Sequence, residues 1–369
     1  MKVLIVNKHI FQTIGGSEMQ CDIIARGLIN RGHSVIYGTP STLPVKGQPG
    51  QNLPYQVDYF DLENVKTVQQ FLLAHKPDII YWRFNKHFLN IIVPTAKTLQ
   101  IPFVFAVSHI NDVTKFAFKS KKLKGITGRF KSIINIWKQK IHSARQYQYF
   151  NYVAGLTSLN SEFLGKVGVP KQRLIRNAVP TGIIDFHWDR PFIVWISSIK
   201  ASKRPEAFIE LAKSCRELEL DFLMIGPIQQ QAYEKPIYEA SKMPNFHYLG
   251  SKNPDEVNGV LSKAYLLINT CEPEGFGNNF IQAWMFGCPS ISLSFDPDGI
   301  IEKQQLGFVS GTEKQMEADV RKLYHNETLR NEMGDMAKLY AQENFSQEGL
   351  AKEVEAFLLE ILNENSLHR

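Results

Sequence analysis

Cysteines are few in this sequence, and they are scattered. Its 369 residues include four of them, Cys21, Cys215, Cys271 and Cys288, and no two form a C-x-x-C pair. A disulfide framework is typical of short, cysteine-dense chains, and a structural zinc site needs closely spaced ligands. The four cysteines therefore predict reduced thiols, and neither a disulfide scaffold nor a zinc site.

The sequence also lacks a long apolar run. No window approaches the roughly 20 apolar residues that cross a bilayer, and the first run, Lys2 to Val6, is too short for a secretory signal. With 44% hydrophobic and 21% charged residues, the composition is that of a globular protein with real cores. We therefore expect a cytoplasmic protein of two or three domains that is not integral to a membrane.

Acidic residues are missing from one long segment. Between Val113 and Ser161 there is no Asp or Glu, whereas ten Lys and Arg residues give +10; the whole chain carries +6, so the remainder is about −4. A concentrated basic segment implies an anionic partner. We do not expect nucleic acid, because no recognition motif is present.

Within this segment, residues 130–149 form a predicted helix with an apolar face beside its lysines. Such a helix suits docking at the anionic inner face of a membrane, and a solvated charged face explains it equally well. The candidate membrane or acceptor patch comprises Lys119, Lys121, Lys122, Lys124, Arg129 and Lys131.

Strand and helix patterns alternate along two similar halves of the chain. Apolar runs at residues 2–6, 34–37, 57–60, 78–82, 102–107 and 152–156 predict strands of the first half, and those at 192–196, 221–225, 246–249, 265–268, 289–293 and 307–309 predict strands of the second. Helical patterns lie between them, and the chain from Glu313 onward reads as helical, with a break at 344–346. The fold class is therefore α/β with doubly wound parallel sheets, and the polar run Pro180–Pro191 is the expected linker.

The first half opens with a strand, a loop ending in Gly15-Gly16, and a helix. Ser17 and Gln20 have the spacing of a capping box at the start of that helix. Both G-x-G-x-x-G and G-x-x-x-x-G-K-[ST] are absent, so the sequence does not support dinucleotide-binding or P-loop chemistry.

In the second half, the stretch 268–284 joins a predicted buried strand to a helix through a loop containing Glu274, Gly275 and Gly277. Ligands of open α/β sheets bind at the carboxyl ends of strands, and the free N–H groups of a helix start suit an anion such as phosphate. An ordinary strand–helix turn, eased by its glycines, is the alternative.

Other polar residues end strands elsewhere. His109 and Asp112 follow a predicted strand and are candidates for chemistry, although a lone histidine can equally bond a loop. Asp296-Pro297-Asp298 matches the D-x-D of metal-dependent transferases, but it follows a different strand in a different architecture, and we interpret it as a chance match.

Four local patterns occur in order along nearly the whole chain: Gly15-Gly16-Ser17-Glu18, Lys203-Arg204-Pro205-Glu206, Glu274-Gly275-Phe276-Gly277 with Gln282 beyond it, and Tyr340-Ala341-Gln342-Glu343-Asn344-Phe345-Ser346. This ordered set resembles the retaining glycosyltransferases of GT-B architecture in family 4, the glycosyl transferases group 1.

The resemblance implies two Rossmann-like domains facing across a cleft. The first is expected at residues 1–185 and holds the acceptor, and the second, at 190–346, holds the nucleotide-sugar donor. A last helix, at about 347–366, is expected to pack back on the first domain.

Roles follow from the resemblance for the residues that match. Glu274 is expected to hydrogen-bond the donor sugar, Lys203 to neutralise the departing diphosphate, and His109 to lie near the reaction centre. Gly15 and Gly16 would let the backbone approach the phosphates. The other expected donor-binding residues are Ser198, Lys200, Arg204, Gly226, Gly275, Phe276, Gly277, Asn278, Asn279 and Gln282.

Two positions depart from the family pattern. Gln282 replaces the glutamate that holds the ribose, and since an amide can donate and accept, binding is expected to survive. Ser198 aligns with an arginine of the phosphate site, and either Lys200 or Arg204 can supply the missing charge.

The implied reaction moves a hexosyl group from a nucleoside diphosphate sugar, with UDP and GDP not distinguished, to a lipid-linked or cell-surface glycan acceptor in polysaccharide biosynthesis. Charge builds on the departing diphosphate, and Lys203 with helix N-termini can absorb it without a metal ion or another cofactor. Two alternatives stay open: a nucleotide-sugar epimerase or hydrolase of the same fold, and a sugar-nucleotide-binding protein without turnover.

Overall fold

The computed structural model describes residues 1–13, 15–44, 53–108, 112, 152–155, 169, 171–271 and 276–367. The chain forms two compact units. The first comprises Met1–Asn177 with Gln347–Arg369, and the second comprises Ala178–Ser346. The first unit thus ends at Asn177, whereas the sequence pattern placed the end of the first domain at residue 185.

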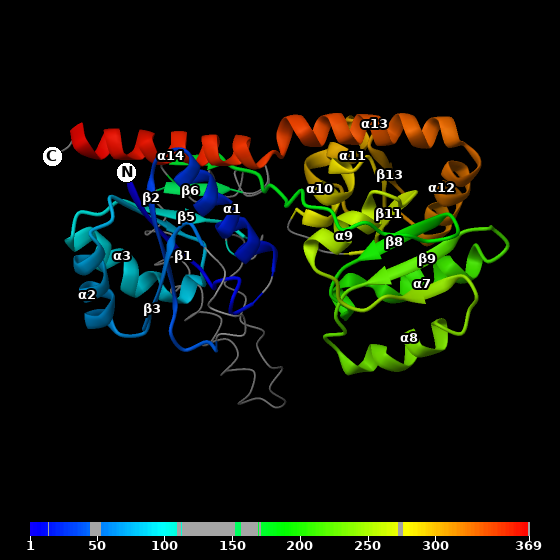
Figure 1. Cartoon of the computed structure of the whole chain (residues 1–369), viewed down its shortest axis with the longest axis horizontal. Coiled ribbons are helices and arrows are strands. Elements are labelled where there is room, and N and C mark those ends of the chain that lie inside the picture. The colour runs from blue at the N-terminus through cyan, green and yellow to red at the C-terminus, as the bar shows by residue number, and fades with distance from the viewer. Residues whose placement is uncertain are drawn as a thin grey trace, which may run out of the picture. The chain divides into compact units, whose positions relative to one another are not determined.

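The described part of the first unit is built on a parallel sheet with the strand order β3-β2-β1-β4-β5-β6-β7 (Figure 1). Its strands are β1 (Lys2–Val6), β2 (Ser34–Pro40), β3 (Gln56–Phe60), β4 (Ile79–Trp82), β5 (Phe103–Ala106), β6 (Tyr152–Gly155) and β7 (Lys171–Leu174). Its helices are α1 (Gly16–Asn30), α2 (Val65–His75), the 3₁₀ turn η1 (Lys86–Phe88), α3 (Leu89–Thr98) and α14 (Gln347–Leu367). Strand β7 was not among the expected strands, because this edge strand is polar and half-buried along its whole length.

The second unit repeats the design with the strand order β10-β9-β8-β11-β12-β13, all parallel. Its strands are β8 (Phe192–Ile196), β9 (Asp221–Ile225), β10 (Phe246–Tyr248), β11 (Leu266–Asn269), β12 (Ser290–Ser292) and β13 (Gly307–Val309). Its helices are α7 (Pro205–Ser214), α8 (Glu234–Ala240), α9 (Pro254–Leu261), α10 (Asn278–Met285), α11 (Ile300–Lys303), α12 (Glu313–His325) and α13 (Glu327–Asn344), with 3₁₀ turns η2 (Ala201–Lys203), η3 (Gln231–Tyr233) and η4 (Pro297–Gly299).

Both sheets are apolar on their two faces, as parallel sheets covered by helices require. Strands β1, β4 and β5 of the first unit and β9 and β11 of the second are buried over nearly all their residues. Trp195 and Phe208 are among the large buried side chains of the second core. The apolar runs that predicted these strands therefore form the central part of each hydrophobic core.

Helix α1 begins differently from the sequence prediction. Its N-cap is Gly15, and no side chain caps it. The hydroxyl of Ser17 accepts a hydrogen bond from Asn7 Nδ2 at 3.1 Å. The predicted capping box of Ser17 and Gln20 is therefore wrong, because Ser17 ties the helix to the end of β1 and Gln20 is buried.

The last helix, α14, lies along α1 in the first unit (Figure 1). The approach is close: a Cβ atom added at Gly27 would lie 2.5 Å from Cβ of Ala351. One side of α14 inserts Val354, Phe357, Leu358 and Ile361 into the unit, and all four are fully buried or nearly so. The helix therefore completes the hydrophobic core that α1 begins.

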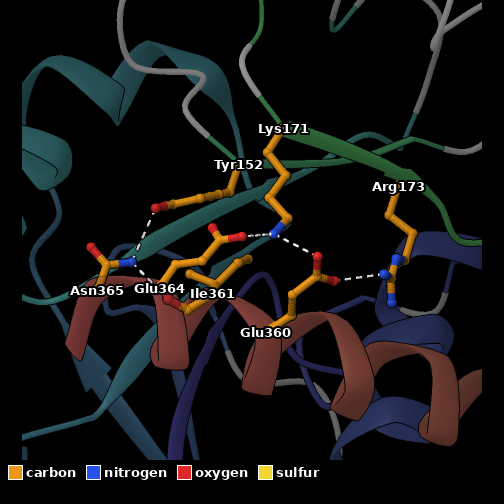
Figure 2. Close-up of polar contacts among 7 residues, drawn as sticks. All are labelled: Tyr152, Lys171, Arg173, Glu360, Ile361, Glu364 and Asn365. Atoms are coloured by element: carbon orange, nitrogen blue, oxygen red, sulfur yellow. Dashed lines mark hydrogen bonds and ion pairs between the residues drawn. The ribbon is translucent and has the colours of Figure 1, made fainter. Parts of the chain in front are cut away.

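Charged pairs fasten the rim of α14 to the two last strands of this sheet (Figure 2). Lys171 of β7 contacts Glu360 at 2.6 Å and also Glu364, while Arg173 reaches Glu360 at 2.6 Å. Asn365 donates to the hydroxyl of Tyr152 at 3.0 Å. The polar sequence of β7, which hid it from the strand prediction, is the surface that binds α14.

Among the described residues, no helix is both long enough and apolar enough to cross a membrane.

Candidate functional site

Three neighbouring strands of the second unit end at the same edge of its sheet. Strand β8 lies between β9 and β11, and all three run in the same direction. The loops after them carry the expected donor-binding residues of this unit: 198–204 after β8, Gly226 after β9 and 276–282 after β11. The parallel topology therefore brings these segments together.

A buried hydroxyl links two of these loops. Thr270, which is fully buried, accepts a hydrogen bond from Trp195 Nε1 at 2.9 Å and donates to the carbonyl oxygen of Lys203 at 2.7 Å. The thiol of Cys271 also reaches the carbonyl oxygen of Ser202 at 3.4 Å. The backbone of the Lys203 turn is thus attached directly to the end of β11, where the Glu274 loop begins.

A side chain in the first turn of helix α10 binds the last residue of β8. Asn279 Nδ2 donates to the carbonyl oxygen of Ile196 at 3.1 Å, and Asn279 Oδ1 accepts from the backbone of Phe280 at 3.0 Å. The side chain of Asn279, which was expected at the donor, therefore fixes the helix start.

Two glycines of the site cannot carry a side chain. At Gly226, φ is 141° and an added Cβ would lie 1.8 Å from the carbonyl oxygen of Ser197. At Gly277, φ is 83° and an added Cβ would lie 2.8 Å from the ring of Phe280. Gly277 is also the N-cap of α10. The two glycines thus allow close backbone approaches at these turns.

Aromatic side chains pack together at Phe276 and helix α10. Phe276 is 1% exposed and packs edge-on against Phe345 with ring centres 5.5 Å apart. Trp284 lies against both Phe345 and Tyr340. Phe276 was expected at the donor, but its side chain belongs to this cluster. Residues of the fourth sequence pattern, 340–346, therefore pack against Phe276 of the third pattern and against helix α10.

One cation of the Lys203 loop, Arg204, forms an ion pair. Arg204, which has a left-handed backbone with φ of 47°, donates from Nη2 to Glu313 of α12 at 2.7 Å. Pro205 follows it at the start of α7. Because the guanidinium of Arg204 is paired with a carboxylate, Lys200 is the better candidate for the charge missing at Ser198.

Gln282 lies half-buried in the second turn of α10. Its Nε2 donates to Oδ1 of Asn258 on α9 at 3.2 Å. Asn258 is fully buried and donates to the carbonyl oxygens of Pro180 and Gly182 at 2.9 and 2.8 Å. The expected ribose ligand is therefore bonded to a buried asparagine that the sequence did not single out.

In the first unit, Gly15 and Gly16 lie at the start of α1, after the loop that follows β1. The carboxylate of Glu18 is folded back so closely that a Cβ added at Gly15 would lie 2.6 Å from Glu18 Oε2. Burial raises the pKa of Glu18, while the nearby cations Lys8 and Arg83 act in the opposite direction. A carboxylate at a helix N-terminus is electrostatically favourable.

A second buried polar cluster follows β1, and no sequence signal marked it. His9 is fully buried, and its Nε2 lies 3.2 Å from the hydroxyl of Tyr55, which in turn donates to Asp22. Burial lowers the pKa of His9 to about 4, so the ring is neutral at pH 7. The cluster secures the loop before Gly15.

Several expected site residues lie outside the described residues. These are Glu274, Gly275, His109 and the whole patch of Lys119, Lys121, Lys122, Lys124, Arg129 and Lys131. Asp112 is described, and its Oδ2 accepts from both the backbone and the hydroxyl of Ser108.

The D-x-D segment serves the backbone. Asp296 accepts hydrogen bonds from the backbone of Ile301 at 2.8 Å and of Glu302 at 3.2 Å, so its carboxylate binds the first turn of the short helix α11. Burial raises its pKa. This use of Asp296 supports the interpretation of the motif as a chance match.

A comparison of the sequence with protein-family models identifies the second unit. Residues 184–340 match the model described as glycosyl transferases group 1. The second unit matches the glycosyl transferases group 1 over most of its length. No curated protein matches the sequence.

The fold of the whole chain is also that of known glycosyltransferases. A glycosyltransferase from Rickettsia africae superposes with a TM-score of 0.73 at 14% identity, covering 99% of this chain and 98% of that one. HepE from Anabaena, solved in complex with UDP and glucose, gives 0.72 at 13% identity, with 98% and 100% covered. WaaG, a glycosyltransferase of lipopolysaccharide biosynthesis, gives 0.68 at 17%, with 95% and 98% covered. The chain has the GT-B fold.

Proposed function

We propose that this protein transfers a sugar from a nucleoside diphosphate sugar to an acceptor, with retention of anomeric configuration and without a metal ion or other cofactor. The match of residues 184–340 to the group 1 glycosyltransferases supports the reaction class. The observation that carries the site is the hydrogen bond from Thr270 to the Lys203 carbonyl, because it attaches the lysine turn to the residue that follows β11, four positions before Glu274 in the sequence.

The charge requirement of the reaction fits these parts. Cleavage of the bond between the sugar and the diphosphate leaves negative charge on the phosphate oxygens, and fixed cations and helix N-termini stabilise that charge. Lys203, Lys200 and the starts of α7 and α10 supply such groups at one edge of the sheet. Glu274 is assigned to the hydroxyls of the donor sugar, and His109 to the neighbourhood of the reaction centre.

The donor nucleotide is UDP or GDP in this proposal. A ligand that binds only the folded protein raises the unfolding temperature by mass action. We expect one of the two diphosphates to raise it at millimolar concentration, whereas uridine and guanosine give a smaller shift. If neither diphosphate shifts the unfolding temperature, UDP and GDP are excluded as the donor nucleotide and this part of the proposal is wrong.

Release of the nucleotide separates transfer from the alternatives. A transferase releases the nucleoside diphosphate faster when its acceptor is present, whereas an epimerase or hydrolase consumes the donor alone. One structural neighbour, a putative UDP-N-acetylglucosamine 2-epimerase from Listeria monocytogenes, has the same fold with a TM-score of 0.67 at 10% identity. Turnover of the donor at one rate with and without membrane glycan extracts would favour that alternative.

The acceptor in this proposal is a lipid-linked or cell-surface glycan intermediate, reached at the inner face of the membrane. The basic segment 113–161, with its charge of +10, supports it. Binding to anionic vesicles should exceed binding to neutral ones and should weaken with added salt. Equal sedimentation with both kinds of vesicle would remove the membrane part of the proposal.

A further inference from the structure

The linker after the first unit is held on the surface of α9. The backbone of Ile184 donates to the carbonyl oxygen of Asp255 at 3.0 Å. At Gly259 an added Cβ would lie 1.8 Å from the carbonyl oxygen of Ile184, so the linker rests directly on the helix backbone. The carbonyl oxygens of Pro180 and Gly182 point to Asn258. This segment therefore behaves as part of the second unit.

Those two carbonyl oxygens fix the orientation of the Asn258 amide. A side-chain amide has two N–H donors and one carbonyl acceptor, and the two ends look alike in shape. Here both N–H donors of Asn258 are used by Pro180 and Gly182. The reversed orientation would face one oxygen toward two others inside a fully buried site, which is unfavourable. Oδ1 of Asn258 must therefore face α10.

The orientation of Asn258 determines that of Gln282. Because Oδ1 accepts hydrogen bonds only, the group facing it must be a donor, and Gln282 presents Nε2 at 3.2 Å. The other end of the amide, Oε1, accepts no hydrogen bond from the described residues. A glutamate at this position would place a carboxylate, which only accepts when ionised, against another acceptor. Glutamine is the residue that this pair requires.

We infer that Asn258 is a positioning residue of the nucleotide site: held by two linker carbonyl oxygens, it turns the Gln282 amide so that Oε1 accepts a hydrogen bond from a ribose hydroxyl. The inference rests on the proposed function and on the role that the family resemblance implies for Gln282, that of ribose ligand. It explains why glutamine replaces glutamate here without loss of the contact, since a hydroxyl can donate to either side chain.

Binding of UDP and GDP, and of their 2′,3′-dideoxy forms, tests the inference by calorimetry. For the base that the wild type binds, we expect the dideoxy form to bind about tenfold more weakly, the loss of one well-placed hydrogen bond. Asn258→Ala and Gln282→Met should weaken the natural diphosphate about tenfold and leave the dideoxy form unchanged, so the ratio approaches one. A purely structural role would weaken both forms equally, and that result, like an unchanged ratio, would overturn the inference.

A second arm needs no ligand. Gln282→Glu should lower the unfolding temperature by about 3 °C or more, since one unfavourable buried contact is created. Gln342→Glu, at an exposed position of α13, is the matched control and should change it little. If Gln282→Glu is as stable as the control, the orientation argued here is wrong. If the wild type binds neither diphosphate while Gln282→Glu is destabilised, the proposed function fails and the amide geometry stands.

Discussion

At the scale of single residues, Thr270 links two separate segments of the second unit through its hydroxyl. Its hydroxyl is the acceptor for Trp195 and the donor for Lys203, and both partners are far from it in sequence. A hydroxyl with one proton can serve both roles only in this arrangement. The lysine turn is therefore positioned by a side chain that does not itself need to touch a ligand.

We predict that Thr270→Val destabilises the protein by about 1–3 kcal/mol, because it leaves a buried indole N–H and a carbonyl oxygen without their partner while keeping the shape of the side chain. Urea unfolding measures the free energy. Thr270→Ser keeps the hydroxyl and should lose less than half as much. An unchanged free energy for the valine variant would mean that the hydroxyl does not link the two loops.

Single residues were predicted from sequence with mixed results. Gly226 and Gly277 were expected at the donor from the family resemblance, and both have a positive φ that favours glycine. Thr270 and Asn258 could not be predicted, since their importance comes from partners brought near only by the order of the strands. For Thr270, the sequence held one indication: a buried tryptophan such as Trp195 needs an acceptor for its indole N–H, and Thr270 is that acceptor. Phe276 and Asn279 were placed at the donor, yet their side chains support the loop.

At the scale of elements, the contact between α1 and α14 decides how the chain end is held. Gly27 leaves no room for a methyl group opposite Ala351. We predict that Gly27→Ala lowers the free energy of unfolding by about 1–3 kcal/mol through overpacking, measured in urea. The double variant Gly27→Ala with Ala351→Gly moves the methyl group to the other helix and should recover most of the loss. A single variant as stable as the wild type would show that the helices do not pack this closely.

The ion pairs of α14 make its attachment dependent on pH. Hydrogen bonds from Arg31 and His33 lower the pKa of Glu355. The hydrogen bond from Lys171, drawn in Figure 2, lowers the pKa of Glu360. A lowered folded-state pKa means that the stabilisation is present above the ordinary value of 4.5 and is lost as the pH falls through the folded value.

We therefore predict that Glu355→Gln and Glu360→Gln lower the unfolding temperature at pH 7 and that their difference from the wild type shrinks as the pH falls below 4.5 and through the lowered folded-state pKa values. The effect should be modest, because exposed ion pairs contribute little. Glu353→Gln, exposed on the same helix, is the control. A difference that persists unchanged at low pH would assign the loss to packing and not to charge.

Elements that bury an apolar run were predictable, and those held by partners were not. The runs of β1, β9 and β11 indicated strands directly. Strand β7 was not predicted, because its polar side chains form ion pairs with α14, which is distant in the sequence. The start of α1 was predicted from a capping box at Ser17. Ser17 does not form this box, and its hydroxyl accepts a hydrogen bond from Asn7 instead.

At the scale of the whole molecule, the chain has the fold of solved glycosyltransferases although few of its residues are identical to theirs. The TM-score of 0.72 with Anabaena HepE comes with only 13% identity. Periodicity and the ordered motifs were sufficient for the architecture, since these depend on residue type and spacing. The sugar, the base and the acceptor depend on pocket details that no short pattern encodes.

The central claim is that the Lys203 turn stabilises a diphosphate. The most direct measurement is the affinity for the nucleoside diphosphate, UDP or GDP, and for the corresponding nucleoside, in Lys203→Ala and in Lys213→Ala, whose lysine is exposed on α7 and paired with Glu210. We predict that Lys203→Ala weakens the diphosphate about tenfold or more and leaves the nucleoside unchanged, whereas Lys213→Ala changes neither. Equal diphosphate affinity in the two variants would contradict the account.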